Sequence, residues 1–344
     1  MPNLGFGMPA VKTKTELKNL LRYATIGTSR ITEEFIQGAS LVEGMELAAV
    51  YSRSAETGKA FAKRFGAPEV FTDIDCLAQS DIDAVYIASP NSLHFLQSRL
   101  FLKNNKNVIC EKPATVTTAE MEELFALAED RGLIYMEAMM SMHSPGKKIM
   151  EEALKKIGKI TSAHFDFSQL SSRYEALKNG ALPNIFNPAL AGGCLMDLGC
   201  YCVYPAVYFF GEPLKISASA GLLQNGADAY GAAVLDYADK QITLTYSKVG
   251  QSRACSQIMG DEGTVTVQSV SQLINIDIIN NYNKSEELMG FMPKPVVMSF
   301  EAGDFFRYVT DIEPNRADYE NARNTALRVN RVMCRIRELA SIRF

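Results

Sequence analysis

A glycine turn near the start of the sequence has the composition of a phosphate-binding site. Residues 26–32 read IGTSRIT, and the turn between an apolar run and an amphipathic one holds Gly27, Thr28, Ser29, Arg30 and Ile31. Gly27 permits a tight turn, and the helix N-terminus after it offers free backbone N–H groups and a positive dipole end to a pyrophosphate. Ser29 and Thr32 replace two glycines of the dinucleotide fingerprint, and both are small. The turn therefore indicates a dinucleotide site, with an ordinary strand-to-helix turn as the alternative.

A second candidate contact with a dinucleotide lies at the end of the next apolar run. NAD-selective domains usually place Asp or Glu there, because a carboxylate accepts hydrogen bonds from the ribose hydroxyls. This chain has Ser52 and Arg53 instead. A guanidinium can bind a 2′-phosphate through two parallel hydrogen bonds. The pair therefore favours NADP over NAD, and the alternative is a solvated arginine just before a helix over residues 55–65.

The elements that must position these groups follow from the hydrophobic pattern. Five short apolar runs alternate with longer amphipathic segments: Tyr23–Ile26, Leu47–Tyr51, Ala84–Ala88, Val108–Cys110 and Leu133–Met136. Unbroken apolar strands separated by helices indicate a parallel sheet buried on both faces. Before the fifth run, Thr117 and Glu120 have the spacing of a capping box and predict where a helix begins. We therefore expect a doubly wound Rossmann domain over residues 22–142, preceded by an extension over residues 1–21.

The pattern changes at about residue 143, where short strands joined by tight turns become frequent. The expected strands are Ile160–Phe167, Leu214–Leu222, Ala232–Tyr237, Ile242–Tyr246 and Thr264–Val267. Helices are expected near Lys147–Lys155, Asp197–Phe210 and Asp318–Leu339. The fold class is therefore α/β, with an α+β domain over residues 143–344 that contains a large, mostly antiparallel open sheet. The free face of this sheet should pair with its own copy in a homodimer or homotetramer.

Composition excludes several classes of function. The 344 residues carry 35 Lys and Arg against 39 Asp and Glu, a net charge of −4, so nucleic acid is not expected as a partner. We identify no apolar run long enough to span a membrane and no signal peptide. The seven cysteines, with no Cys-x-x-Cys pair, indicate free thiols in a reducing compartment and no metal site. We therefore expect a cytoplasmic protein.

Three further segments resemble a known family. Residues 89–94 read SPNSLH, residues 111–113 read EKP, and residues 192–201 read GGCLMDLGCY. In this order and on these elements, they resemble the Gfo/Idh/MocA family of dehydrogenases, and the resemblance runs from about Arg22 to the C-terminus. The EKP tripeptide directly after a strand is its most specific mark. The resemblance and the position of this tripeptide also favour a cis Lys112–Pro113 peptide bond.

The resemblance implies a nicotinamide cofactor and a set of site residues. Lys112 would be the catalytic-site lysine, Asp197 matches the aspartate of the family's Asp-x-Gly-x-His segment, and Tyr201 takes the histidine position. A tyrosine there resembles glucose–fructose oxidoreductase, dimeric dihydrodiol dehydrogenases and NADP-dependent xylose dehydrogenases. Many relatives have an arginine where this chain has Met142, so the resemblance implies no particular sugar. The implied cofactor contacts on two strand ends are Ser89, Pro90, Asn91, His94, Glu111 and Lys112.

The implied reaction is hydride transfer between a nicotinamide and the hydroxyl or carbonyl carbon of a sugar, polyol or cyclic diol. Oxidation of an alcohol needs a base within hydrogen-bond reach of its hydroxyl. The phenol of Tyr201 has an ordinary pKa of about 10, which the ammonium of Lys112 would lower. Asp197, four residues before Tyr201, lies on the same face of the predicted helix. We expect an NADP-dependent enzyme that could also take NAD, and the alternative is a non-catalytic dinucleotide-sensing regulator on the same fold.

Overall fold

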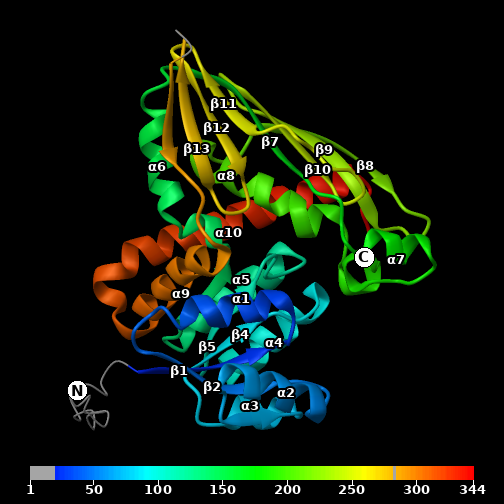
Figure 1. The fold of residues 1–344 in the computed structure, drawn as a ribbon, viewed down its shortest axis with the longest axis vertical. Coiled ribbons are helices and arrows are strands. Elements are labelled where there is room, and N and C mark those ends of the chain that lie inside the picture. Colours follow the sequence, from blue (N-terminus) through cyan, green and yellow to red (C-terminus); the bar gives the residue numbers. More distant parts are fainter. Residues whose placement is uncertain (1–19, 282–283) are drawn as a thin grey trace, which may run out of the picture.

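The computed structural model describes residues 20–281 and 284–344, so the predicted extension over residues 1–21 lies almost entirely outside the described residues. The first sheet has six parallel strands in the order β3-β2-β1-β4-β5-β6 (Figure 1). Its elements are β1 (Leu21–Ile26), α1 (Arg30–Ala39), β2 (Met45–Tyr51), α2 (Ala55–Phe65), β3 (Glu69–Phe71), α3 (Ile74–Gln79), β4 (Ala84–Ile87), α4 (Asn91–Lys103), β5 (Asn107–Glu111), α5 (Thr118–Asp130) and β6 (Tyr135–Ala138).

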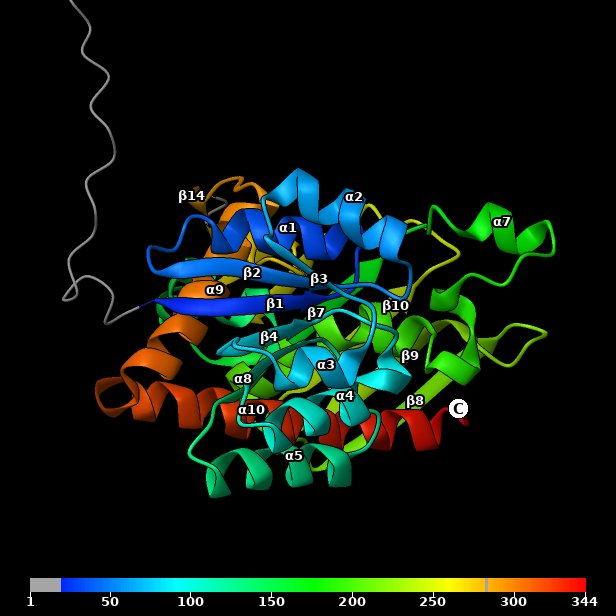
Figure 2. The same cartoon turned by 90° about the horizontal axis from the view of Figure 1, so that it is seen from below.

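Helices cover both faces of this sheet, as the unbroken apolar runs predicted. Helices α1 and α2 lie on one side, and α4 and α5 lie on the other (Figure 2). All four residues of β4 are buried, because each side chain meets one of the two helical layers. The capping box that begins α5 is also present, with Thr117 and Glu120 bonding reciprocally. The Rossmann fold class is therefore confirmed.

The sequence analysis did not predict the edge strand β3. It has three residues, and its burial is only partial because it has a neighbour on one side alone. A strand this short and this exposed produces no apolar run, so periodicity cannot identify it.

The second sheet has eight strands in the order β14-β13-β12-β11-β7-β10-β9-β8. All its pairs are antiparallel except β7 with β10. The predicted large, mostly antiparallel sheet is therefore confirmed. Its elements are α6 (Pro145–Leu154), β7 (Ile160–Ser168), α7 (Tyr174–Lys178), α8 (Cys200–Phe210), β8 (Lys215–Leu222), β9 (Asp228–Asp236), β10 (Gln241–Ser247), β11 (Ser256–Gly260), β12 (Gly263–Ser269), β13 (Ile274–Asn280), β14 (Ser285–Met289), α9 (Lys294–Thr310) and α10 (Ile312–Leu339).

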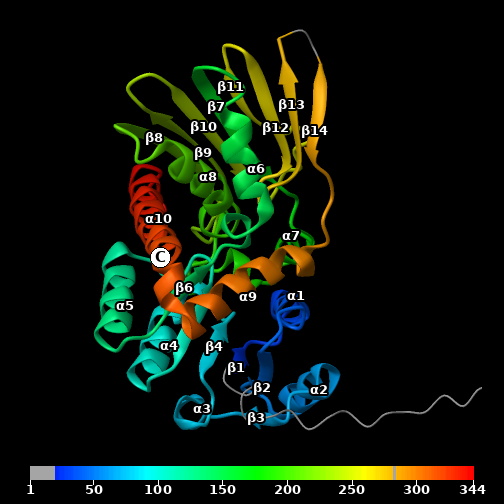
Figure 3. The same cartoon turned by 90° about the vertical axis from the view of Figure 1, so that its left-hand side faces the viewer.

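The two faces of the second sheet differ in polarity. Helices α6, α8 and α10 lie along one face (Figure 3). Strand β10 alternates as expected: Ile242, Leu244 and Tyr246 are buried beneath the helices, whereas Thr243 and Thr245 point to the opposite face and are half-buried. The opposite face, which no long helix of the described chain covers, carries Thr243 and Thr245 together with His164 and Asp166, to which they are hydrogen-bonded.

The last two helices connect the two sheets. Helix α9, which the sequence analysis did not predict, packs against α1, and Lys294 at its start forms an ion pair of 2.7 Å with Glu34. Helix α10 begins at Ile312, six residues before the predicted start, and packs against α5 and α8. The C-terminus of the chain therefore helps to hold the first domain against the second.

One segment corrects the expectation that no apolar run could span a membrane. Pro188–Phe210 is long and apolar enough by length and composition. In the fold, however, 89% of its most apolar window is buried inside the protein. The segment includes α8, which packs between the second sheet and α10, so its apolar character is explained by its place in the core.

Candidate active site

A cleft of about 920 Å³ lies between the two domains. In doubly wound folds, ligands bind at the carboxyl ends of the strands where the strand order reverses, which here is between β1 and β4. Gly27, Thr28, Ser52 and Arg53 lie outside the lining of this cleft. The predicted residues that line it are Ser29, Arg30, Ile31, Ser89, Pro90, Asn91, His94, Glu111, Lys112, Asp197 and Tyr201.

The glycine turn has the geometry of a phosphate cradle. Gly27 has a φ of +112°, and a Cβ at this position would lie 2.7 Å from the carbonyl oxygen of Ala88. Helix α1 begins at Arg30, and the side chain of its N-cap residue Ser29 accepts no hydrogen bond from the helix backbone. The three residues at this helix start, Ser29, Arg30 and Ile31, line the cleft. These features fit the pyrophosphate of a dinucleotide.

The predicted 2′-phosphate site lies on the strand next to this turn. Ile26 of β1 pairs with Tyr51 of β2, so Ser52 and Arg53 follow directly beside the glycine turn. Ser52 is half-buried, and its hydroxyl accepts a hydrogen bond of 3.3 Å from the backbone of Ser54. Arg53 is exposed and forms no ion pair with any described residue. Its guanidinium is therefore available to an anion.

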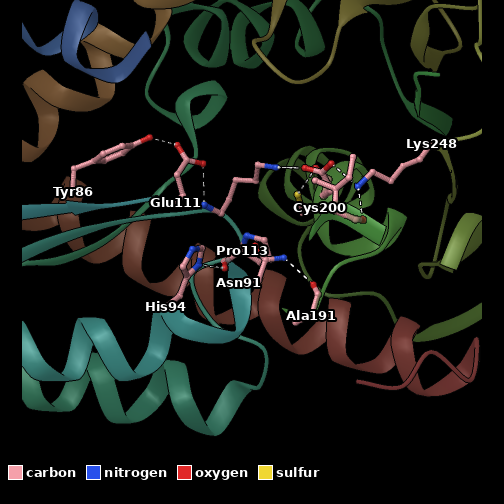
Figure 4. A network of polar contacts seen from close by, with 11 residues as sticks. Tyr86, Asn91, His94, Glu111, Pro113, Ala191, Cys200 and Lys248 are labelled. Carbon is pink, nitrogen blue, oxygen red and sulfur yellow. Dashed lines mark hydrogen bonds and ion pairs between the residues drawn. The ribbon is translucent and has the colours of Figure 1, made fainter. Parts of the chain in front are cut away.

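Two loops at the ends of β4 and β5 are tied together by His94. Its Nδ1 lies 2.9 Å from the carbonyl oxygen of Pro113, and its Nε2 lies 2.8 Å from that of Ser89 (Figure 4). The Lys112–Pro113 bond is cis, as predicted. The side-chain amide of Asn91 donates a hydrogen bond of 2.9 Å to the carbonyl of Ala191 in the second domain. Because the ring of His94 is buried and each of its nitrogens lies at hydrogen-bond distance from a backbone carbonyl, this residue holds the two loops in place relative to each other.

The three predicted catalytic residues converge on one point. The ammonium of Lys112 lies 3.1 Å from Oδ1 of Asp197 and 2.8 Å from the Asp197 carbonyl oxygen. The same ammonium lies 4.6 Å from the centre of the Tyr201 ring. The Tyr201 hydroxyl forms no hydrogen bond with any described residue, and the tyrosine lines the cleft. This phenol is therefore free to meet a substrate oxygen.

The charge states of these groups follow from their burial and their neighbours. Burial alone would raise the pKa of Asp197, but Lys112 and Lys248 together hold it well below its usual range. Burial would lower the pKa of Lys112, but Tyr201 and Asp197 raise it well above its ordinary value. Burial raises the pKa of Tyr201, and the opposing effect of Lys112 is smaller. The expectation that Lys112 would bring the phenol below its ordinary pKa is therefore wrong for the free protein.

Asp197 sits on an unusual backbone. Residues Leu195–Gly199 form a π-helical turn before α8 begins, so the four-residue spacing to Tyr201 covers less than one turn here. The turn is anchored by Asp228, whose buried carboxylate accepts a hydrogen bond of 2.6 Å from the Leu195 N–H. The predicted regular helix is therefore wrong in detail, although Lys112 contacts both residues. Widened helical turns of this kind are frequent at functional sites.

Glu111 holds the backbone next to Lys112 through its side-chain hydrogen bonds. It is buried, and its carboxylate accepts hydrogen bonds from the Tyr86 hydroxyl at 2.5 Å and from the Lys112 backbone at 3.3 Å. Burial raises the pKa of this carboxyl, although Lys112 and Tyr86 oppose the effect. Glu111 therefore fixes the backbone from which the Lys112 side chain reaches the cleft.

Sequence reasoning missed two residues of this site, Lys248 and Asp228. Lys248 follows β10 and contributes a second ammonium to Asp197. Asp228 opens β9 and holds the π-helical turn. No local motif marks either one, because each acts on residues that are distant in the sequence.

Comparison with known proteins agrees with this architecture. The model of the Gfo/Idh/MocA oxidoreductase family, NAD-binding Rossmann fold, matches residues 21–139, and the model of the family's C-terminal domain matches residues 150–266. The scyllo-inositol 2-dehydrogenase (NADP⁺) IolU of Bacillus subtilis is 39% identical over 302 residues, which are 88% of this chain and 91% of that protein. The uncharacterized oxidoreductase YgjR of Escherichia coli is 41% identical over 270 residues, 78% and 82% of the two chains.

A solved structure shares the whole fold. The 3-ketoreductase KijD10 from Actinomadura kijaniata, in complex with NADP and TDP-benzene, superposes with a TM-score of 0.80 at 24% identity, over 93% of this chain and 98% of that one. The matched family models cover both domains, and the sequence identities hold over most of the chain. The chain therefore belongs to the Gfo/Idh/MocA family of oxidoreductases.

Proposed function

We propose that this chain is an NADP-dependent oxidoreductase that transfers a hydride between the nicotinamide and the hydroxyl or carbonyl carbon of a sugar, polyol or cyclic diol. One observation carries the proposal: Lys112, Asp197 and Tyr201 meet at the cleft beside the glycine turn. The names of relatives point the same way, since they include dehydrogenases of scyllo-inositol, D-xylose and trans-1,2-dihydrobenzene-1,2-diol.

The residues that would hold the cofactor extend from the glycine turn into the cleft. The backbone at Gly27–Ile31 would receive the pyrophosphate, Ser52 and Arg53 the 2′-phosphate, and the segment 89–94 the nicotinamide side. When bound, the nicotinamide supplies or accepts the hydride. Lys112 and Glu111, at the end of β5, border the same space.

In this proposal Tyr201 moves the proton. Burial raises the pKa of its phenol, so the free protein holds this proton at neutral pH. A protonated phenol can donate to the oxygen of a carbonyl as that oxygen gains charge. In the opposite direction the phenol must first be ionised, and the ammonium of Lys112 over its ring favours the phenolate. Asp197 keeps Lys112 in this place.

The substrate side of the cleft suits a polyhydroxylated molecule. A hydroxyl both donates and accepts hydrogen bonds, and amide and hydroxyl side chains can do the same. The second domain supplies such groups to the lining: Ser168, Gln169, Asn184, Gln251, Ser252, Ser271 and Gln272.

Turnover tests the proposal against the alternative of a dinucleotide-sensing regulator. The protein should be assayed spectrophotometrically with NADP⁺ or NAD⁺ and a panel of inositols, aldoses and cyclic diols, and with NADPH or NADH and the corresponding carbonyl compounds. We expect turnover of at least one polyol or its ketone. Tight NADPH binding without turnover across the whole panel would favour the regulator.

Cofactor choice should depend on Arg53. Because this guanidinium is exposed and forms no ion pair with a described residue, Arg53→Ala should weaken NADP⁺ binding by about 10-fold or more, in the range of a charged hydrogen bond. NAD⁺ binding should change little, since it lacks the 2′-phosphate. Fluorescence titration with both cofactors measures this, with Arg64→Ala on the neighbouring helix as the control. Equal losses for the two cofactors would show that Arg53 does not contact the 2′-phosphate.

The open face of the second sheet should form a homodimer or homotetramer interface. Val234 and Thr243 are paired on this face and are only half-buried in the single chain. A charge placed there would be buried against the partner without a counter-ion, so Val234→Lys should dissociate the assembly. Light scattering after gel filtration at micromolar concentration measures the mass. Leu41→Lys, at an exposed position of the first domain, is the control, and a monomeric wild-type protein would contradict the prediction.

The compartment also stays a prediction. All seven cysteines are free in the structure, including the four buried ones. Free thiols suit a reducing environment, so we propose a cytoplasmic location.

A further inference from the structure

Lys248 is the most deeply buried lysine of the cleft. Its side chain is only 2% exposed. Its ammonium lies 2.8 Å from Oδ2 of Asp197, donates a hydrogen bond of 3.0 Å to the carbonyl of Ile185, and lies 5.2 Å from the centre of the Phe186 ring. The backbone of Lys248 is fixed as well, since its N–H bonds to Ala229 at 2.8 Å. The side chain thus connects β10, the segment 184–186 and the π-helical turn.

Two lysines share the Asp197 carboxylate, with one oxygen for each. Lys112 contacts Oδ1 from the first domain, and Lys248 contacts Oδ2 from the second. Figure 4 shows Lys248 extending toward the helix of Cys200 from the side opposite to Glu111. A carboxylate held at both oxygens cannot rotate without breaking a charged hydrogen bond. The orientation of Asp197 therefore depends on both cations.

We propose that Lys248 is a positioning residue for the reaction, and that it locks Asp197 so that Lys112 stays over the ring of Tyr201. This inference rests on the proposed function of the Lys112–Asp197–Tyr201 group. Nothing in the sequence motifs assigns a role to Lys248. The lysine acts through Asp197 and does not need to touch the substrate.

Lys248 is among the residues that line the cleft, but its ammonium is directed mainly to groups of the protein. Two of the three ammonium protons are directed to Asp197 and Ile185. The segment 184–186 also lines the substrate side of the cleft through Asn184 and Ile185. Lys248 therefore contacts both Asp197 and the segment 184–186, which forms one wall of the substrate side of the cleft.

Removal of Lys248 would change how Asp197 titrates. The charged and titratable groups around Asp197 are Lys112 just after β5, Lys248 just after β10, Cys194 just before the π-helical turn, and Cys200 and Tyr201 of α8. Asp228 of β9 lies beyond them, nearer to Lys248. Without Lys248, burial is opposed by one cation instead of two, so the pKa of Asp197 should rise. Protonated Asp197 would hold Lys112 less firmly, and activity should then fall as the pH is lowered.

The test compares Lys248→Met, Lys248→Arg and the control Lys240→Met, which changes a lysine in the turn before β10. For Lys248→Met we expect kcat to fall by up to about 10²-fold, as for a misplaced catalytic group, with KM for NADP⁺ unchanged. Its kcat should also acquire an acidic limb at a higher pH than the wild type shows, because the pKa of Asp197 rises when one of its two cations is removed. Lys248→Arg should recover part of kcat and remove that limb. A Lys248→Met enzyme with the wild-type pH profile and kcat would overturn the proposal.

A second measurement, an NMR titration, does not require turnover and uses a different variant of Lys248. The Asp197 carboxyl can be titrated by ¹³C NMR, assigned through Asp197→Asn, in the wild type and in Lys248→Gln. An upward shift of this pKa in the variant supports the lock, and identical titration curves contradict it. If the wild type turns over no substrate, the proposed function fails while this titration still decides whether Lys248 controls Asp197.

Discussion

Replacing Tyr201 with phenylalanine should lower kcat by about 10²–10⁴-fold, the usual loss for one general acid–base group. The substitution keeps the ring, its edge-on contact with Phe167 at 5.5 Å and its place under the Lys112 ammonium. It removes only the hydroxyl, which forms no hydrogen bond with any described residue. Stability and NADP⁺ affinity should therefore change little. Steady-state kinetics and a cofactor titration separate the two effects.

Lys112→Met should cause a loss of similar size by a different physical route. The methionine resembles the alkyl part of the lysine side chain but lacks the ammonium that contacts Asp197 and the Tyr201 ring. The phenolate of Tyr201 then loses its main electrostatic support. Because the two residues act as one unit, the double variant should lose much less than the product of the two single losses.

Tyr135→Phe is the matched control for this cycle. Tyr135 lies in β6 and is not part of the cleft lining, and its hydroxyl is buried without a hydrogen-bond partner among the described residues. Near-normal turnover is expected for it. If Tyr201→Phe behaved like this control, Tyr201 would be a core residue and the proton would have to move through Lys112 or Asp197.

Much of the fold could be predicted because its signals are local. Strands such as β4 are buried on both faces, so every residue is apolar and the run is visible in the sequence. Helix α9 was missed because its buried face includes Glu301 and Asp304, which interrupt the apolar pattern. Strand β14 was missed because its first three residues, Ser285, Glu286 and Glu287, are exposed and polar.

The site was predictable to the extent that it lies at strand ends. Gly27 and Lys112 follow β1 and β5, and parallel strands bring their carboxyl ends to one edge. Asp197 and Tyr201 came from the family resemblance, and their distance from Lys112 became known only from the structure. Lys248 could not be predicted from the sequence. Its ion pair with Asp197 depends on how β10 and the π-helical turn pack together.

The π-helical turn that carries Asp197 should be sensitive to a single methyl group at Gly193. A Cβ on Gly193 would lie 1.9 Å from Oδ1 of Asp228. That carboxylate cannot move freely, since it is fully buried and accepts the Leu195 N–H at 2.6 Å. Gly193→Ala must therefore displace either Asp228 or the turn itself. Overpacking of this kind costs about 1–3 kcal/mol of stability.

In Gly193→Ala, we expect the loss in kcat to be larger than the loss in stability. Asp197 lies four residues later, and its backbone N–H bonds to the Gly193 carbonyl at 3.3 Å, so a shift of Gly193 moves the carboxylate that holds Lys112. A displacement of about 1 Å can cost on the order of 10²-fold in rate. Gly303→Ala in α9 is the control, because its added Cβ meets the nearest atom at 3.8 Å and alanine favours a helix interior. A Gly193→Ala protein with a lowered melting temperature but full kcat would mean that Asp228 yields without moving Asp197, and that the π-helical turn is held by its packing rather than by this carboxylate.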